Sequence, residues 1–229
     1  AALLLLLGSA PAAGHVGQDQ EGRVPFLADG EVLGGLTTWG LALPVGDHYE
    51  RVCEEAIGPV AFFAYRRQTG DILVGALDGL LITRDQGCTY EVLSGALDGL
   101  SPSGLAQAGG SLFVTTARYG QANGIFRSDD DGDSWTPVFG PQTEMLLFRI
   151  FASADGSHLI ATGSRSGSST APVVLVSTTA GASFSDVSAG YGGYVLVTAL
   201  GFREDGTSAM LSALTAGNQS SVLIAPGAS

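Results

Sequence analysis

The chain has 229 residues, a length that can bury a substantial core in one domain or two. Its formal net charge is −12 and it has no lysine, which argues against binding to nucleic acid or to an anionic membrane, because both need a basic face. Charged residues make up only 14% of the chain and glycines number 34, a composition that suits many short strands joined by glycine-rich turns.

Residues 1–13 form an apolar run in which five consecutive leucines precede an Ala-Pro-Ala sequence. This pattern is typical of the hydrophobic core and cleavage region of a secretory signal peptide. The alternative is a buried N-terminal helix or strand, which the leucines do not favour because they have no amphipathic period. The run is too short to span a bilayer as it stands. We therefore expect a protein that is secreted or held in the cell envelope, with a polar segment at 14–23.

From residue 24 onward, short apolar stretches and turns group into five units, at about 24–53, 59–94, 104–139, 145–188 and 194–229. Each of the first four units predicts three strands, a tight turn and a short fourth strand. The fifth unit lacks its fourth strand. A period of about 40–50 residues with four strands per unit is expected for the blades of a β-propeller.

The turn of the third unit, at 128–135, reads Ser-x-Asp-x-Gly-x-Ser-Trp. The carboxylate of Asp130 can accept hydrogen bonds from backbone N–H groups, and the hydroxyls of Ser128 and Ser134 can close the turn. Gly132 supplies the positive φ that a tight reversal needs. Trp135 then enters the next strand as a large apolar anchor.

The same frame recurs in the other units. The second unit has every position of the pattern, in the fourth unit Thr179 replaces the aspartate, and the first unit keeps only the glycine and the aromatic residue. The matching residues are Thr83, Asp85, Gly87, Thr89 and Tyr90 in the second unit, and Ser177, Gly181, Ser183 and Phe184 in the fourth. An ordinary β-sandwich with Asp-Gly hairpins is the alternative. In a β-sandwich, however, nothing requires the same turn to recur at near-constant spacing with an aromatic residue after it.

These turns resemble the Asp-box of BNR-type β-propellers, and the resemblance covers about residues 24–229. The resemblance implies an all-β fold, a β-propeller of four-stranded antiparallel blades. The chain would contain four full blades and most of a fifth. It would be similar to exported propellers of the sortilin and sialidase type. A propeller must close its ring, because an open blade edge invites aggregation. Either residues 14–24 supply the missing strand, or the sequence is part of a larger ring, which we favour.

Two cysteines are present, one in each of two neighbouring units. Cys53 lies in the last predicted strand of the first unit, and Cys88 lies in the turn of the second. An even number of cysteines in an exported protein suggests a bridge, so we predict a Cys53–Cys88 disulfide. The alternative is two unpaired thiols.

Metal chemistry has weak support. Asp129, Asp131 and Asp133 alternate as in a calcium loop, but Ser134 and Gly140 stand where an EF-hand needs glycine and glutamate. The histidines at 15, 48 and 158 have no zinc spacing. We therefore expect no metal and no cofactor.

The resemblance to sialidases would imply an arginine triad, a Tyr–Glu pair and an Asp acid/base. Arg149 lacks the proline of the sialidase Arg-Ile-Pro motif and lies after the third turn instead of before the first. Glycoside hydrolysis needs two carboxyl groups at a set separation. The available carboxylates lie mostly beside glycines at turns: Glu54, Glu55, Asp71, Asp155, Glu204 and Asp205. We therefore assign no catalytic residue and predict a non-catalytic propeller that binds protein or glycan; the alternative is a glycoside hydrolase of sialidase or xyloglucanase type.

Overall fold

The computed structural model describes residues 24–28, 31–37, 40–51, 61–85, 87–166 and 171–225. The predicted signal peptide at 1–13, the polar segment at 14–23 and Cys53 lie outside these residues. The part of the chain that the structure describes has no helix long and apolar enough to cross a membrane.

The described chain forms five antiparallel sheets, each made of strands consecutive in sequence. The first holds β1 (Val24–Ala28), β2 (Glu31–Thr37), β3 (Gly40–Val45) and β4 (His48–Arg51). The second holds β5 (Ala61–Arg66), β6 (Ile72–Ala76), β7 (Gly79–Thr83) and β8 (Glu91–Val92). The third holds β9 (Pro102–Ala108), β10 (Ser111–Thr116), β11 (Asn123–Ser128) and β12 (Thr136–Gln142).

The fourth sheet holds β13 (Met145–Ala152), β14 (Leu159–Arg165), β15 (Ala171–Ser177) and β16 (Ser185–Asp186). A short 3-10 helix, η1 (Ser188–Tyr191), leads to the fifth sheet, which holds β17 (Leu196–Phe202), β18 (Ala209–Leu214) and β19 (Ser220–Ala225). The predicted fold class is therefore confirmed: four full four-stranded blades are followed by three strands of a fifth.

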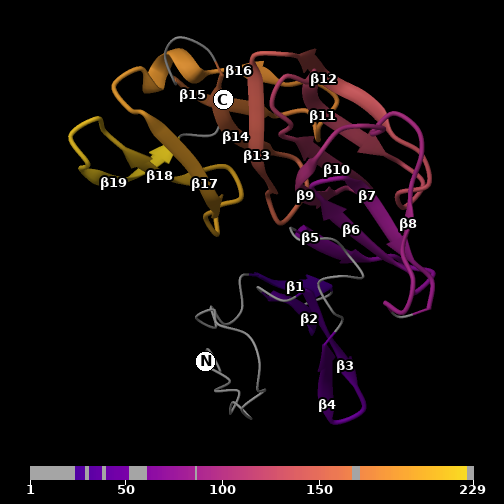
Figure 1. The fold of residues 1–229 in the computed structure, drawn as a ribbon. Helices are drawn as coiled ribbons and strands as arrows, with labels where there is room; N and C mark the ends of the chain where they lie inside the picture. The colour runs from indigo at the N-terminus through magenta and orange to yellow at the C-terminus, as the bar shows by residue number, and fades with distance from the viewer. Residues whose placement is uncertain are drawn as a thin grey trace.

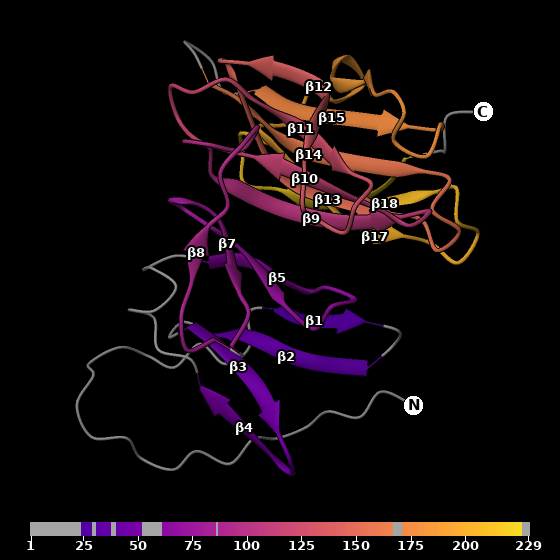
Figure 2. The same cartoon turned by 90° about the vertical axis from the view of Figure 1, so that its right-hand side faces the viewer.

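The five blades follow one another along an arc. Figure 1 shows the first strands of the blades, β1, β5, β9, β13 and β17, on the inner side of this arc, and Figure 2 shows the sheets arrayed one after another. We call these five strands the inner strands. A turn is formed after the third strand of each of blades two to four, at 83–90, 128–135 and 177–184, and we call these three the repeat turns.

The core consists of layers between neighbouring blades. One hydrophobic cluster joins blades two and three, with Leu73 and Ile82 against Leu112 and Phe126. Another joins blades three and four, and a further one joins blades four and five, where Val174 meets Leu211. Because each strand alternates its side chains between two faces, one face of a blade packs on the preceding blade and the other on the following blade.

Candidate functional site

The repeat turn at 128–135 is held by one hydroxyl and one carboxylate. The amide of Gly132 donates to Oγ of Ser128 at 2.8 Å, and Oγ of Ser128 donates to Oδ1 of Asp130 at 2.7 Å. The amide and the hydroxyl of Ser134 donate to the two oxygens of Asp130, at 2.9 and 2.5 Å. Nε1 of Trp135 donates to the carbonyl of Gly132 at 3.2 Å, which fixes the ring over the turn.

The other two repeat turns use the same bonds. In the turn at 83–90, the amide of Gly87 donates to Thr83 and the amide of Thr89 donates to Asp85, at 2.7 and 2.8 Å. In the turn at 177–184, the amide of Gly181 donates to Ser177 at 2.9 Å, and the amide of Ser183 donates to Oγ1 of Thr179 at 3.0 Å. A threonine hydroxyl thus accepts the bond that a carboxylate accepts in the other two turns.

The hydrogen bonds keep the turn carboxylates ionised. Donation from the side chain and the amide of Ser134 lowers the pKa of Asp130 to about 2. Donation from the amide and side chain of Thr89 lowers the pKa of Asp85. Asp155, in the turn between β13 and β14, has a pKa of about 2 because Ser153 and Ser157 donate to it. These carboxylates are turn acceptors, and none of them is poised to release or take up a proton near neutral pH.

The glycine of each repeat turn is buried, and two of them touch the preceding blade. Gly132 has φ +94°, and a Cβ there would lie 2.5 Å from Cδ1 of Leu73 in β6. Gly181 has φ +79°, and a Cβ there would lie 2.2 Å from Cε1 of Phe113 in β10. The aromatic residues are half-buried; Phe184 meets Phe139 edge to face, with centroids 6.4 Å apart. The repeat turns of blades three and four therefore pack against the preceding blade.

The alternating aspartates of the turn at 128–135 also bind the preceding blade. Arg67, buried at the end of β5, donates through Nε to the carbonyl of Asp131 at 2.8 Å and through Nη2 to Oδ1 of Asp133 at 2.6 Å. Oδ2 of Asp131 accepts the amide of Gln68 at 2.8 Å. The third aspartate, Asp129, accepts Nε of Arg127 at 2.7 Å. The three aspartates that resemble a calcium loop thus accept hydrogen bonds from arginines, from the hydroxyls of Tyr65 and Ser111, and from a backbone amide.

Across the described residues, no group of three or more His, Cys, Asp or Glu side chains could hold a metal ion. Among the described residues, Cys88 is exposed and forms no disulfide. The Cys53–Cys88 disulfide stays a prediction. The repeat turn at 83–90 places Cys88 at an exposed position, and Cys53 lies outside the described residues.

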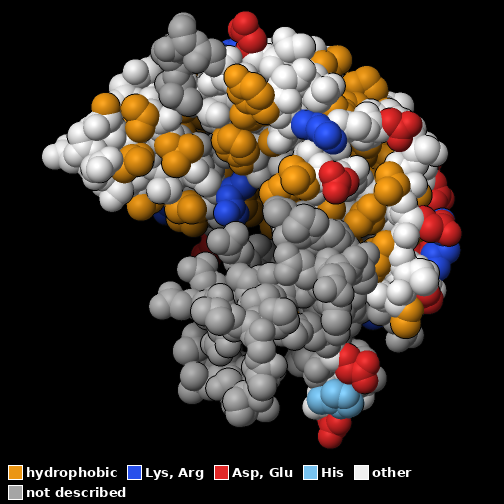
Figure 3. Space-filling model, viewed as in Figure 1, with side chains coloured by type: hydrophobic (Ala, Val, Ile, Leu, Met, Phe, Trp, Pro, Cys, Tyr) orange, Lys and Arg blue, Asp and Glu red, His pale blue; other side chains and the backbone are white. Residues whose placement is uncertain are grey.

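The inner strands offer a second candidate surface. Phe148 in β13 has no pairing partner in β14, and Phe62 in β5 has none in β6. Both residues therefore form β-bulges. Phe148 is 39% exposed and Leu200, at a bulge of β17, is 49% exposed. The next residue after Phe148, Arg149, is exposed and has no ion pair within the described residues. Figure 3 shows hydrophobic side chains and a basic one on this inner side.

The five inner strands contain no aspartate or glutamate. A pair of carboxyl groups facing each other across this surface, which glycoside hydrolysis needs, would have to come from connecting loops. Among these exposed residues, Phe148 and Leu200 offer apolar contacts, and Arg149 offers a guanidinium that could pair with an anionic group.

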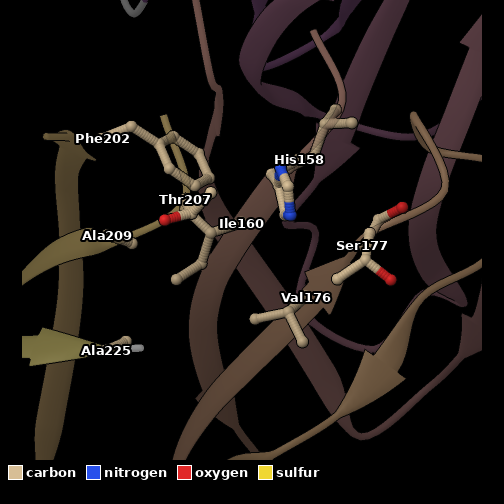
Figure 4. A pocket seen from close by; sticks show the side chains of 10 residues that line it. His158, Ile160, Val176, Ser177, Phe202, Thr207, Ala209 and Ala225 are labelled. Atoms are coloured by element: carbon tan, nitrogen blue, oxygen red, sulfur yellow. The ribbon is translucent and has the colours of Figure 1, made fainter. Parts of the chain in front are cut away.

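A shallow hollow lies between blades four and five, next to the end of β19. Figure 4 shows Ile160, Val176, Phe202 and Ala209 around it, with the imidazole of His158 at one side. Nδ1 of His158 is 2.7 Å from Oγ of Ser157. The lining residues include no carboxylate and no cysteine, so the hollow lacks an acid–base pair or a metal-ligand set.

Sequence reasoning missed Arg67 and the bulged inner-strand residues. The sequence signal that could have indicated Arg67 is that two consecutive arginines, Arg66 and Arg67, follow an apolar strand in a chain with few basic residues. The bulges left no sequence signal that we can identify, because a single skipped residue does not disturb an apolar pattern such as that of β13.

No protein-family model matches the chain, and no curated protein matches it. Among solved structures, the chain is similar to the GH74 xyloglucanase from Xanthomonas campestris, with 13% identity and a TM-score of 0.52, covering 82% of this chain and 36% of that one. A putative gluconolactonase gives 14% identity and a TM-score of 0.50, covering 80% of this chain and 69% of that one. YCF48 bound to D1 peptide gives 14% identity and a TM-score of 0.44, covering 74% and 51%.

The chain therefore spans only about a third of the length of the xyloglucanase. Likeness at this level of identity shows the fold and nothing of the activity. Together with the five sheets, it shows that the chain has the β-propeller fold.

Proposed function

We propose that this chain is an exported, non-catalytic β-propeller of the Asp-box type, which binds a protein or glycan ligand outside the cell or in the cell envelope. The observation that supports binding most directly is the inner-strand surface. It presents the exposed side chains of Phe148, Leu200 and Arg149 on strands that contain no carboxylate.

The electrostatics of the carboxylates supports a non-catalytic role. The general acid of a glycosidase needs a raised pKa, which burial or a neighbouring negative charge provides. Within the described residues, each aspartate whose pKa departs from its ordinary value has it lowered: Asp85, Asp129, Asp130, Asp155, Asp186 and Asp205. The hydroxyl and amide donors of the turns favour the ionised form of these groups.

The Asp-box assignment rests on the three repeat turns, in which the same positions make the same hydrogen bonds and the same glycine is buried. Export is supported by the apolar run at 1–13 and its Ala-Pro-Ala sequence.

The second candidate is a glycoside hydrolase of sialidase or xyloglucanase type. The observation in its favour is the likeness of this chain to the GH74 xyloglucanase. The two candidates differ in what they require of the inner surface, since a hydrolase needs two facing carboxyl groups and a binding protein does not.

Glycan and peptide arrays, probed with the wild-type chain and with Phe148→Ser and Arg149→Ala, test the proposal. We expect a defined ligand whose affinity falls at least about tenfold in each variant, since buried aromatic and arginine contacts dominate binding. Arg84→Ala is the matched control, because Arg84 is an exposed arginine paired with Glu91 away from the inner strands. Turnover of a xyloglucan oligosaccharide or a fluorogenic sialoside, abolished by one carboxylate substitution, would establish the hydrolase instead.

A further inference from the structure

One irregularity recurs at the same place in blades two, three and four. In each of them a single residue of the first strand has no partner in the second strand: Phe62 in β5, Ser103 in β9 and Phe148 in β13. The residues that pair with the first residue of the repeat turn are Ile72, Leu112 and Leu159. In all three blades the bulge lies opposite the third and fourth residues after that one. The three bulges are therefore in register, and they set their side chains at one level of the inner strands.

The bulge of β13 exposes two consecutive side chains. Side chains of a regular strand alternate between its two faces, so only one of Phe148 and Arg149 would point away from the buried interface. The bulge interrupts this alternation, and both residues are exposed between the buried Leu147 and Ile150. The strands β9 and β17 contact β13 on its two sides, so both of its neighbours are described and its exposed residues lie on the inner side of the arc (Figure 1).

The neighbouring strand β9 holds the bulge of β13 in place. Oγ of Ser103 donates to the carbonyl of Leu147, the residue before Phe148. Gly104 follows Ser103, and a Cβ there would lie 3.1 Å from Cα of Arg149. A side chain at this glycine does not fit between the two strands, so its absence lets them lie close together. Ser103 and Gly104 therefore position the pair of exposed residues.

Arg149 has no carboxylate partner within the described residues, although the chain has a net charge of −12. Other arginines of the described chain form ion pairs: Arg67, Arg84, Arg127 and Arg165. The inner strands supply no aspartate or glutamate beside Arg149. A guanidinium donates hydrogen bonds, accepts none, and pairs with both oxygens of a carboxylate. The unpaired Arg149 therefore favours an anionic group in the ligand.

The composition of the inner strands favours a peptide over a glycan. Sugar hydroxyls both donate and accept hydrogen bonds, so a glycan site needs side-chain acceptors as well as donors. The inner strands contain no aspartate, glutamate or asparagine. A peptide with acidic and apolar side chains matches the residues that are present, because Arg149 can pair with its carboxylate and the half-buried Phe62 and exposed Phe148 offer apolar contacts.

We propose that Phe62, Ser103, Phe148 and Arg149, which we call the bulge band, bind an acidic peptide segment. A carboxylate of the peptide pairs with Arg149, and an adjacent apolar side chain packs on Phe148. This inference rests on the proposed ligand binding at the inner strands. It adds the class of ligand, the sign of its charge and the contribution of β5 and β9.

The test is a peptide array probed with the full chain. It holds octapeptides in matched sets, in which one position among apolar residues carries glutamate, glutamine or lysine. We expect the glutamate peptides of the best-bound sets to bind at least about tenfold more tightly than their glutamine counterparts. Arg149→Gln should remove this difference, and Arg149→Glu should shift the preference to lysine. Arg84→Gln removes an exposed arginine paired with Glu91, and as the matched control it should leave the preference unchanged.

Hydrogen exchange on the wild-type chain tests the extent of the bulge band without any variant. The bound glutamate peptide should slow exchange at the amides of Phe62, Ser103 and Phe148, which lie on three different strands. Slower exchange on β13 alone would overturn the bulge band as one site.

The remaining outcomes separate this inference from the proposed function. Equal binding of the glutamate and glutamine peptides, an unchanged preference in Arg149→Glu, or a glycan as the ligand would overturn the acidic peptide and leave ligand binding by the chain standing. A chain that binds neither peptide nor glycan would overturn both.

Discussion

The repeat turns at 128–135 and 177–184 have the same shape but different acceptors at the third position. Asp130 accepts the amide of Ser134 at 2.9 Å, and Thr179 accepts the amide of Ser183 at 3.0 Å. Their glycines are both buried at positive φ against the preceding blade. The turn therefore requires a short hydrogen-bond acceptor and a glycine, and does not require a negative charge.

The two turns differ in what else they bind. The turn at 128–135 also engages the buried Arg67 through Asp131 and Asp133. The turn at 177–184 has Ala180 and Ala182 at those positions and relies on the contact of Gly181 with Phe113. We call the bonds of Arg67 to Asp131 and Asp133 the polar clamp. The turn at 128–135 is thus bound to the preceding blade by this clamp, whereas the turn at 177–184 contacts the preceding blade by packing.

The largest expected effect is that of Gly181→Val. The new side chain would clash with the ring of the fully buried Phe113 and would hold a β-branched residue at positive φ, so we expect a loss of about 4 kcal/mol of unfolding free energy. Gly110→Val is the control, because Gly110 has φ +86° with open space around it. It should cost only about 1–2 kcal/mol. If urea denaturation shows the same loss of unfolding free energy in both variants, the ring of Phe113 moves to accommodate the new side chain, and the predicted clash is wrong.

Arg67→Ala tests the polar clamp. The substitution leaves Asp131 without a cation in a half-buried position, so we expect a loss of about 2–3 kcal/mol, less than for a fully buried pair because Asp133 is 68% exposed. Arg84→Ala removes an exposed ion pair with Glu91 and should cost about 0.5 kcal/mol or less. Thermal unfolding measures the stability of both variants. Similar unfolding midpoints for Arg67→Ala and Arg84→Ala would mean that the bonds of Arg67 do not stabilise the fold more than an exposed ion pair does.

Exchanging the acceptors tests the equivalence of the two turns directly. Asp130→Thr should cost about 0.5 kcal/mol, since Thr179 makes the same bond with a hydroxyl. Asp130→Ala leaves the Ser134 amide without its acceptor and should cost about 1 kcal/mol or more. If the threonine variant is as unstable as the alanine variant in chemical denaturation, charge matters more than the comparison suggests.

The smallest effect is that of pH. The pKa of Asp130 is lowered to about 2 in the folded chain, so its bonds stabilise the fold at pH values above its unfolded pKa near 4. This stabilisation is lost as the pH falls from about 4 to about 2, because protonation then favours the unfolded chain. Thermal melts over this range should show a weaker acid dependence in Asp130→Thr than in wild type. Unchanged dependence would assign the acid sensitivity to other carboxylates, such as Asp155.

Much of the fold follows from the sequence because one turn is repeated in register with an aromatic residue. The positions of Gly87, Gly132 and Gly181 mark the turns, and the apolar stretches around them mark the strands. The short β8 and β16, with two residues each, could be placed because they follow the aromatic residue directly.

The candidate inner surface could not be predicted in the same way. Phe148 and Arg149 read as part of an apolar strand, and their exposure depends on a bulge in the register of β13 with β14. The pairing of Arg67 with Asp131 and Asp133 joins residues more than 60 positions apart, so only the packing of blade three on blade two reveals it.

By itself, the sequence determined the blades, their order and the chemistry of the turns, because these depend on contacts within a few residues. The tertiary structure decided which faces of the blades are covered and which polar groups meet across them. Those contacts join residues distant in the chain, and the burial that they produce depends on the neighbouring blade and not on the local pattern.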